Sequence, residues 1–194
     1  QRTLELQKQA DELKAYHEKQ ELQIWINQGL SEVADEIRKN RGDLKTVASG
    51  LMNVVMKRVK APVGALYFKT ADSHENELRI LANIGLDSEN ADEVIDSREG
   101  LVGKCFSTSQ PIILEKVPDG FFRITSGLGK ATPTSMLILP LLVDDKCIGV
   151  TELASFKPFT TEQREYIERA FDNIAAQLNI IQMNNYNQKL IDEY

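Results

Sequence analysis

Residues 135–155 read SMLILPLLV-DDK-CIGVTELAS, and they contain the clearest indication of the fold of this chain. Two apolar runs, Ser135 to Val143 and Cys147 to Ser155, flank the polar triplet Asp144-Asp145-Lys146. Apolar runs of this length that are separated by a short polar turn are typical of an antiparallel β-hairpin. We therefore predict two neighbouring strands of an antiparallel sheet.

More strands are expected upstream of this hairpin. Val63 to Phe68 and Leu78 to Ile84 are rich in apolar residues, and the polar tip from Thr70 to Asn76 joins them as a second hairpin. Residues 85–99 are acidic and polar, which indicates a surface loop. Pro111 to Leu114 begins another strand.

A short helix and a long connection lie between the two hairpins. Gly100-Leu-Val-Gly103 opens a helix that is expected to run to about Ser109. Residues 117–134 have little regular pattern. A connection of this length within a compact domain is usually functional or mobile, so it is a candidate ligand-binding loop.

Amphipathic helices flank the strands on both sides. Asp43 is expected to cap a helix with apolar positions at helical spacing from Leu44 to Val59. Thr160 or Thr161 is expected to cap the last helix. Its apolar stripe follows a 4-3-4-3 spacing over Ile167, Phe171, Ile174, Leu178 and Ile181.

Residues 1–40 contain no proline and are rich in Gln, Glu, Lys and Leu, which favours one long helix. Its first half carries a weak heptad seam formed by Leu6, Ala10, Leu13, His17, Gln20 and Ile24. A second stripe from Ile26 to Ile37 is displaced from this seam. We therefore expect the helix to face a partner helix early and a sheet later.

The order of these elements predicts an α+β fold. We expect an antiparallel sheet with helices packed on one face, flanked by long N- and C-terminal helices of the coiled-coil type. The chain has 194 residues and a formal net charge of −6. Without a Lys/Arg cluster, this charge argues against nucleic acid or an anionic membrane as a partner. The longest apolar run, Met136 to Val143, is too short to span a bilayer.

A series of short motifs resembles the pattern of the GAF domain family, in the family's order and spacing over about residues 30–182. The motifs are Gly100-Leu-Val-Gly-Lys, Gln110-Pro-Ile, Leu139-Pro-Leu-Leu, Ile148-Gly-Val-Thr-Glu-Leu-Ala-Ser and Phe159-Thr. The resemblance implies a GAF/PAS-like fold. Segments beginning at Trp25 and Phe122 are similar to bacterial hybrid sensor histidine kinases, in which a GAF domain follows a HAMP module.

This resemblance implies a domain organisation and a cellular context. Residues 1–29 would form a signalling helix, residues 30–182 the GAF domain, and residues 183–194 the start of an output helix. We expect the chain to be part of a longer protein, with a HAMP-type module upstream and a kinase domain downstream. It would then be the cytoplasmic part of a membrane-anchored receptor, with no direct membrane contact of its own.

The first pocket candidate is Glu152, an acid on a strand face that is expected to carry Ile148, Val150 and Ala154 as well. An unpaired buried carboxylate is costly, so Glu152 is expected to meet an arginine, a backbone N–H group or a ligand. In related GAF domains that bind cyclic nucleotides, a Glu at the matching position contacts the base. The alternatives are a salt bridge, for example to Arg123, and exposure at the end of a strand.

The other pocket candidates lie in the short helix and in the long connection: Leu101, Val102, Phe121, Phe122, Arg123, Ser126 and Thr134. The two phenylalanines would form an apolar lid, the arginine would neutralise an anion, and the hydroxyls would donate hydrogen bonds. The first helical residues would form the floor of the pocket, as in the family. The alternative is ordinary core for these apolar side chains and a solvated arginine.

Several chemistries are not expected from this sequence. Ser155-Phe156-Lys157 replaces the Asn-Lys of cyclic-nucleotide GAF domains, and neither cysteine has the neighbouring histidine of bilin-binding relatives. No cofactor is evident, although an unidentified small ligand is compatible with the pocket candidates. His17 and His74 lie in separate elements, so no metal site is expected. The fragment itself is expected to be non-catalytic.

The sequence therefore predicts a sensory and relay domain that forms a homodimer through its terminal helices. The residues expected at this contact are Leu6, Ala10, Leu13, His17, Ile24, Leu178 and Ile181. One alternative is a ligandless dimerisation module of a chemoreceptor or a cyclic-di-GMP enzyme. A more remote alternative is a free methionine sulfoxide reductase that uses Cys105 or Cys147.

Overall fold

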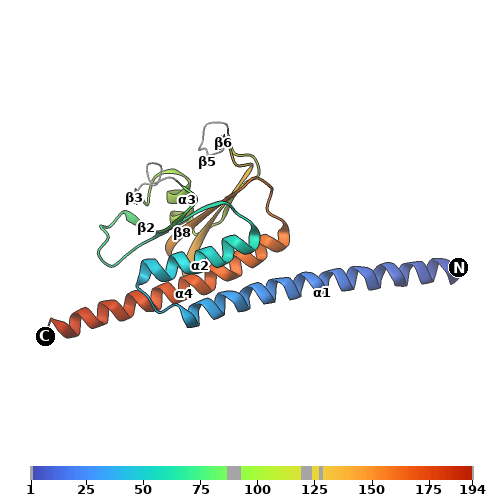
Figure 1. Cartoon of the computed structure of the whole chain (residues 1–194), viewed down its shortest axis with the longest axis horizontal. Coiled ribbons are helices and arrows are strands. Elements are labelled where there is room, and N and C mark those ends of the chain that lie inside the picture. The colour runs from blue at the N-terminus through green and yellow to red at the C-terminus, as the bar shows by residue number, and fades with distance from the viewer. Residues whose placement is uncertain (1, 87–92, 119–123, 127–128, 194) are drawn as a thin grey trace.

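A computed structural model describes residues 2–86, 93–118, 124–126 and 129–193 of the chain (Figure 1). The helices and strands of this structure are α1 (Arg2–Lys39), α2 (Leu44–Val59), β1 (Val63–Phe68), β2 (Glu77–Ile84), β3 (Val94–Asp96), α3 (Gly100–Thr108), β4 (Ile112–Leu114), β5 (Ile124–Ser126), β6 (Gly129–Ala131), β7 (Ser135–Val143), β8 (Lys146–Ser155) and α4 (Thr161–Asp192).

The main sheet has six antiparallel strands in the order β3-β2-β1-β8-β7-β4. Strands β7 and β8 form the predicted hairpin. It turns over Asp144 and Asp145, which have φ angles of 49° and 62°. Two successive residues with positive φ are the mark of the primed turn that matches the twist of a hairpin, and Asp tolerates this conformation. The predicted α+β class with an antiparallel sheet is confirmed.

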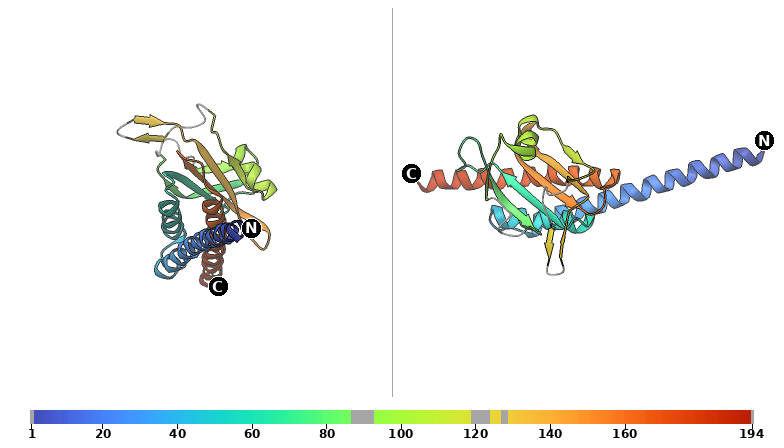
Figure 2. Two further views of the ribbon diagram at one scale, coloured as in Figure 1. Left: turned by 90° about the vertical axis from the view of Figure 1, so that its right-hand side faces the viewer. Right: turned by 90° about the horizontal axis from the view of Figure 1, so that it is seen from above.

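The long helices cover one face of the sheet. Helices α2 and α4 lie directly against the strands, and α1 lies on the side of α2 and α4 that faces away from the sheet (Figures 1 and 2). The expectation that the second half of α1 faces the sheet is therefore wrong. Because α2 and α4 already cover the strands, Ile26, Gly29 and Val33 of α1 fill the groove between these two helices instead.

The short helix α3 is the exception to packing on one face, because it contacts β7 and β8 from the opposite side. There it covers a smaller apolar cluster, whereas the larger core lies between the sheet and the long helices. One face of the sheet is therefore covered by long helices, and the other is covered less completely.

Local sequence signals set the beginnings of two helices as expected. The carboxylate of Asp43 accepts a hydrogen bond from the backbone N–H of Thr46 at 2.8 Å and caps α2. Thr160, not Thr161, caps α4, and it forms a capping box with Gln163.

Short strands were missed in two segments that the sequence shows as irregular. Strand β3 lies within the expected loop 85–99, and strands β5 and β6 lie within residues 117–134. Strand β3 has three residues and pairs with the edge of β2. A strand this short has no readable periodicity, because its hydrogen bonds come from a partner that is distant in the sequence.

The two terminal helices run in the same direction and pack together, yet they leave the domain at opposite ends (Figure 1). Residues 2–24 of α1 are exposed, and so are residues 183–193 at the end of α4. Within the part of the chain that the structure describes, no helix is apolar enough over a sufficient length to cross a membrane.

Candidate functional site

The sheet face that lies away from the long helices carries Glu152. In the register of β8, Glu152 lies between Ala65 of β1 and Ile138 of β7, and both neighbours are buried. Val150 and Ala154, two positions away on the same face, are also buried. The period of two along the strand therefore places the acid within an apolar cluster, as the sequence predicts.

The expectation that Ile148 lies on this face is wrong. Ile148 is the extra residue of a bulge between Cys147 and Gly149, and it packs against the core beneath the long helices.

The carboxylate of Glu152 is only partly exposed, and it forms no hydrogen bond or ion pair with the residues that the structure describes. Burial among apolar side chains disfavours the charged form and raises the pKa of Glu152 to about 7. Near neutral pH this group therefore exists in both protonation states. A donor placed beside it would shift it towards the carboxylate.

Helix α3 brings two predicted residues to the same face. Val102 is buried in the cluster, and Leu101 packs partly buried at its border. Gly103 lets the helix approach the preceding turn closely, because a Cβ at this position would lie 2.7 Å from the backbone carbon of Arg98. Leu101 and Val102 therefore lie on the same side of the sheet as Glu152, where they pack with the apolar cluster.

Both cysteines belong to this face as well. Cys105 of α3 is fully buried, and burial, followed by the charges of Cys147 and Glu152, raises its pKa to about 12. Burial also raises the pKa of Cys147, whose thiol donates a 3.1 Å hydrogen bond to the carbonyl of Gly149. Both thiols are therefore protonated at neutral pH, which is unfavourable for nucleophilic chemistry.

The remaining pocket candidates are placed only in part. Thr134 is exposed, and its backbone N–H donates to the carbonyl of Ser155 at 2.9 Å, which ties this segment to the end of β8. Ser126 lies in β5, but its side chain is not described. Phe121, Phe122 and Arg123 lie outside the described residues. Of the pocket candidates, Leu101, Val102 and Glu152 therefore lie on the same side of the sheet.

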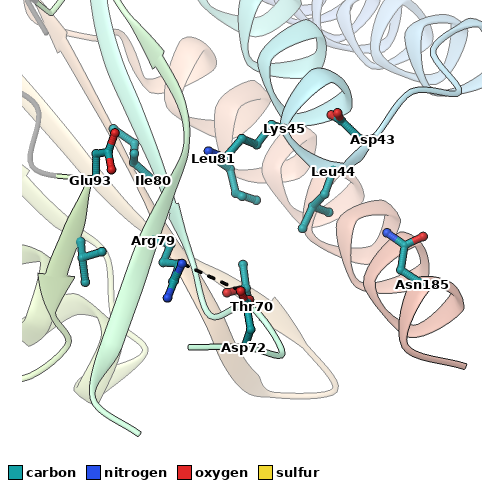
Figure 3. Close-up of a pocket in the computed structure, with 11 residues that line it drawn as sticks. Asp43, Leu44, Lys45, Thr70, Asp72, Arg79, Ile80, Leu81, Glu93 and Asn185 are labelled. Carbon is teal, nitrogen blue, oxygen red and sulfur yellow. Dashed lines mark ion pairs between the residues drawn. The ribbon is translucent and has the colours of Figure 1, made fainter. Parts of the chain in front are cut away.

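A separate cleft of about 460 Å³ lies beside the start of α2 (Figure 3). Asp72 of the β1–β2 hairpin and Arg79 of β2 form an ion pair of 3.9 Å within it, and Asn185 of α4 lies at its border. A hydrogen bond from Thr70, followed by smaller effects that include the charge of Arg79, lowers the pKa of Asp72. Sequence reasoning missed this cleft, because four separate elements supply its lining and no single segment carries a signal.

The residues predicted for a helix-to-helix contact fall into two groups. Leu6, Leu13 and Ile24 are exposed by 65%, 58% and 54%, and the intervening positions Ala10 and His17 are exposed as well. By contrast, Leu178 is fully buried in the core of its own chain and Ile181 packs partly against that core.

The reason lies in the faces of α4. The 4-3-4-3 stripe from Ile167 to Ile181 packs against the core of its own chain, so it already has an intrachain partner. A different face of the helix carries the exposed apolar side chains Ile180, Met183 and Leu190. A helix-to-helix contact between copies would therefore use these residues and not Leu178.

Comparisons with known proteins agree with this geometry. The family model described as GAF domain matches residues 42–179. The GAF domain of a phosphoenolpyruvate-protein phosphotransferase from Coxiella burnetii is similar with a TM-score of 0.70 and 17% identity, over 84% of this chain and 98% of that chain. The corresponding domain from Acinetobacter has a TM-score of 0.64 and 21% identity, over 82% and 93% of the two chains.

Free methionine-R-sulfoxide reductase from Neisseria meningitidis, solved with its substrate, is also similar, with a TM-score of 0.61 and 18% identity over 84% of this chain and 91% of that chain. These identities are low, so the likeness supports the fold and not a shared activity. Comparison with curated proteins gives no match.

Proposed function

Because this chain belongs to the GAF domain family, we propose that it is a sensory and relay domain of a bacterial signalling protein. A small ligand on the Glu152 face, or a movement imposed on α1, would change how α1 packs against α4. The fragment would be non-catalytic, since both thiols are protonated and neither is set up as a nucleophile.

The observation that carries this proposal is the contact between the two terminal helices. Helix α1 and helix α4 run in the same direction, pack together over the domain, and project from it at opposite ends (Figure 1). A displacement that enters through the free end of α1 would reach α4 through this contact. The arrangement suits a module that sits between an upstream input and a downstream output.

The ligand proposal rests on Glu152. A partly exposed carboxyl with no described partner favours a molecule that offers N–H donors, which would stabilise the ionised form. Such a ligand can switch the domain only if it binds one packing of the helices more tightly than the other. A HAMP-type module upstream and a kinase domain downstream remain our proposal for the parent chain, supported by the resemblance of the linker segments.

We propose a parallel homodimer as the working form. The exposed apolar side chains of α1 and α4 would pair with those of a second copy: Leu6, Leu13, Ile24, Ile180, Met183 and Leu190. Ala10 and His17 also face outward in the seam of α1. A polar residue such as His17 would lower the stability of this contact while fixing its register.

Native mass spectrometry of the intact chain tests both the proposed dimer and the proposed ligand. We expect a dimer that carries a small molecule, and loss of that molecule in Glu152→Gln. A monomer at high protein concentration would contradict the dimer. A dimer with no molecule in either protein would contradict ligand sensing and favour a ligandless dimerisation module.

A further inference from the structure

The junction of α1, α2 and α4 contains a nearly buried arginine that no sequence signal marked. Arg58 belongs to the last turn of α2, and its side chain is 13% exposed. Its Nη2 donates a 2.6 Å hydrogen bond to the carbonyl oxygen of Trp25, and its Nη1 forms a 2.9 Å ion pair with Glu32. Both partners belong to α1, so one side chain of α2 holds the first helix at two points.

The same guanidinium lies against two aromatic rings. Its central carbon is 4.7 Å from the ring centre of Trp25 and 5.7 Å from that of Tyr166 in α4. The two rings pack edge to face with their centres 5.4 Å apart. Arg58 therefore connects the first helix, the second helix and the beginning of the last helix in one cluster.

Gly29 makes this contact possible. It lies between Trp25 and Glu32 on the same stripe of α1 and is buried. A Cβ at position 29 would lie 2.5 Å from Cε2 of Tyr166 and 2.6 Å from Nε of Arg58. The missing side chain leaves a notch in the surface of α1, and Arg58 and Tyr166 occupy that notch.

The notch fixes both the rotation and the register of α1. Turning the helix by one residue rotates its surface by about 100°, and sliding it by one turn moves it by about 5.4 Å. Either movement replaces Gly29 with a residue that has a side chain and removes the partners of Arg58. Because a nearly buried guanidinium without partners is costly, intermediate positions of α1 are disfavoured.

The cluster also lies at the point where α1 changes character. The exposed seam of α1 ends at Ile24, and the stripe that packs on α2 and α4 begins with Trp25 and Ile26. When the free half of α1 is displaced, the contacts of Arg58 are therefore the first contacts with the domain that this displacement strains. We propose that Arg58 is a clamp that locks α1 into this notch, and that α1 shifts against α4 in one step when the clamp opens.

This inference deepens the proposed relay function and rests on it for its biological meaning. The test uses the intact chain with spin labels at Gln28→Cys on α1 and Asn173→Cys on α4, both exposed positions, in a Cys147→Ser background. Labelled chain is mixed with an excess of unlabelled chain, so that pulsed dipolar spectroscopy measures the distance between the two helices within one chain. Arg58→Lys keeps the charge but removes the fork of donors, Gly29→Ala fills the notch, and Arg169→Met removes an exposed ion pair of α4 as a matched control.

We expect one distance between the labels in the protein without further substitutions and in Arg169→Met. We expect a second, distinct distance in Arg58→Lys and Gly29→Ala. Hydrogen exchange of residues 26–37 should rise by about tenfold in the same two variants, while α4 keeps its protection. An unchanged single distance in both variants, or a continuous broadening without a second population, would overturn the clamp. Should one variant fail to fold, the other decides the outcome.

The mass of each labelled protein, measured in the same samples, separates this inference from the proposed function. A monomer that shows the two distances would support the clamp and contradict the dimer. A dimer that keeps a single distance in both variants would contradict the clamp and leave the dimer standing.

Discussion

The two faces of the central sheet differ in what they bury. The face beneath α2 and α4 is covered by long helices and holds a continuous apolar core, with fully buried side chains such as Leu66, Leu153 and Phe171. The opposite face has a short helix, a smaller apolar cluster, the carboxyl group of Glu152 and the thiols of Cys105 and Cys147. We infer that the helix-covered face contributes most of the stability, whereas the opposite face carries the unfavourable burial of Glu152.

The largest effect is expected on the helix-covered face. Phe171→Ala removes a fully buried ring and should lower the free energy of unfolding by about 3–5 kcal/mol. Denaturant unfolding followed by circular dichroism measures this loss. Phe156→Ala, at a 46% exposed position, is the control and should change stability by less than about 1 kcal/mol. Equal losses in the two variants would contradict the assignment of Phe171 to the core beneath the long helices.

The second prediction concerns the energetic cost of burying the carboxylate of Glu152 on the opposite face. Its pKa is raised from 4.5 to about 7, so the folded protein binds more protons than the unfolded chain within this interval. Protonated Glu152 therefore favours the folded state, and this contribution to the free energy of unfolding is fully present below pH 4.5. It is lost as the pH rises towards 7. Glu152→Gln should abolish this slope and raise the free energy of unfolding at pH 8 by about 1–3 kcal/mol.

Unfolding of the parent and Glu152→Gln proteins at pH 5 and pH 8 measures this effect in the absence of added ligand. Glu168→Gln, on the exposed side of α4, serves as the control and should keep the slope of the parent protein. A variant that is less stable than the parent at pH 8 would show that the carboxylate has a stabilising partner.

The helices of the two faces also begin differently. Thr160 caps α4 with a reciprocal pair of hydrogen bonds to Gln163, whereas Glu99 precedes α3 and makes no capping hydrogen bond through its side chain. Thr160→Ala should therefore lower the free energy of unfolding by about 1 kcal/mol, and Glu99→Ala should change it by less than about 0.5 kcal/mol. Thermal unfolding of both variants measures the difference, and a larger loss in Glu99→Ala would contradict it.

The sequence predicts features that depend on neighbouring residues. The turn at Asp144 and Asp145, the caps Asp43 and Thr160, and the strand face that carries Glu152 all follow from local chemistry or periodicity. These features need only a few consecutive residues. Their positions in the structure agree with the expectation for that reason.

The features that sequence reasoning missed depend on residues that are distant in the chain. Arg58 looks like an ordinary basic residue at the end of a helix until α1 and α4 bring Trp25 and Tyr166 to it. Leu178 fits a heptad, but the same spacing also suits a helix that packs on a sheet. A glycine within an otherwise good helix, such as Gly29, is the sequence signal that could have pointed to a close contact.

The smallest expected effect is on the reactivity of the two thiols. It distinguishes the proposed sensory role from the alternative of a thiol-dependent reductase. Because burial raises the pKa of Cys105 to about 12 and also raises that of Cys147, both should react with iodoacetamide more slowly than a free cysteine at pH 7.5. Mass spectrometry of the modified protein over time measures each rate, with denatured protein as the control. Cys105 should be modified only as the protein unfolds. Fast modification of either thiol in the folded protein would revive the reductase alternative, since that chemistry requires a thiolate on the face that we assign to ligand binding.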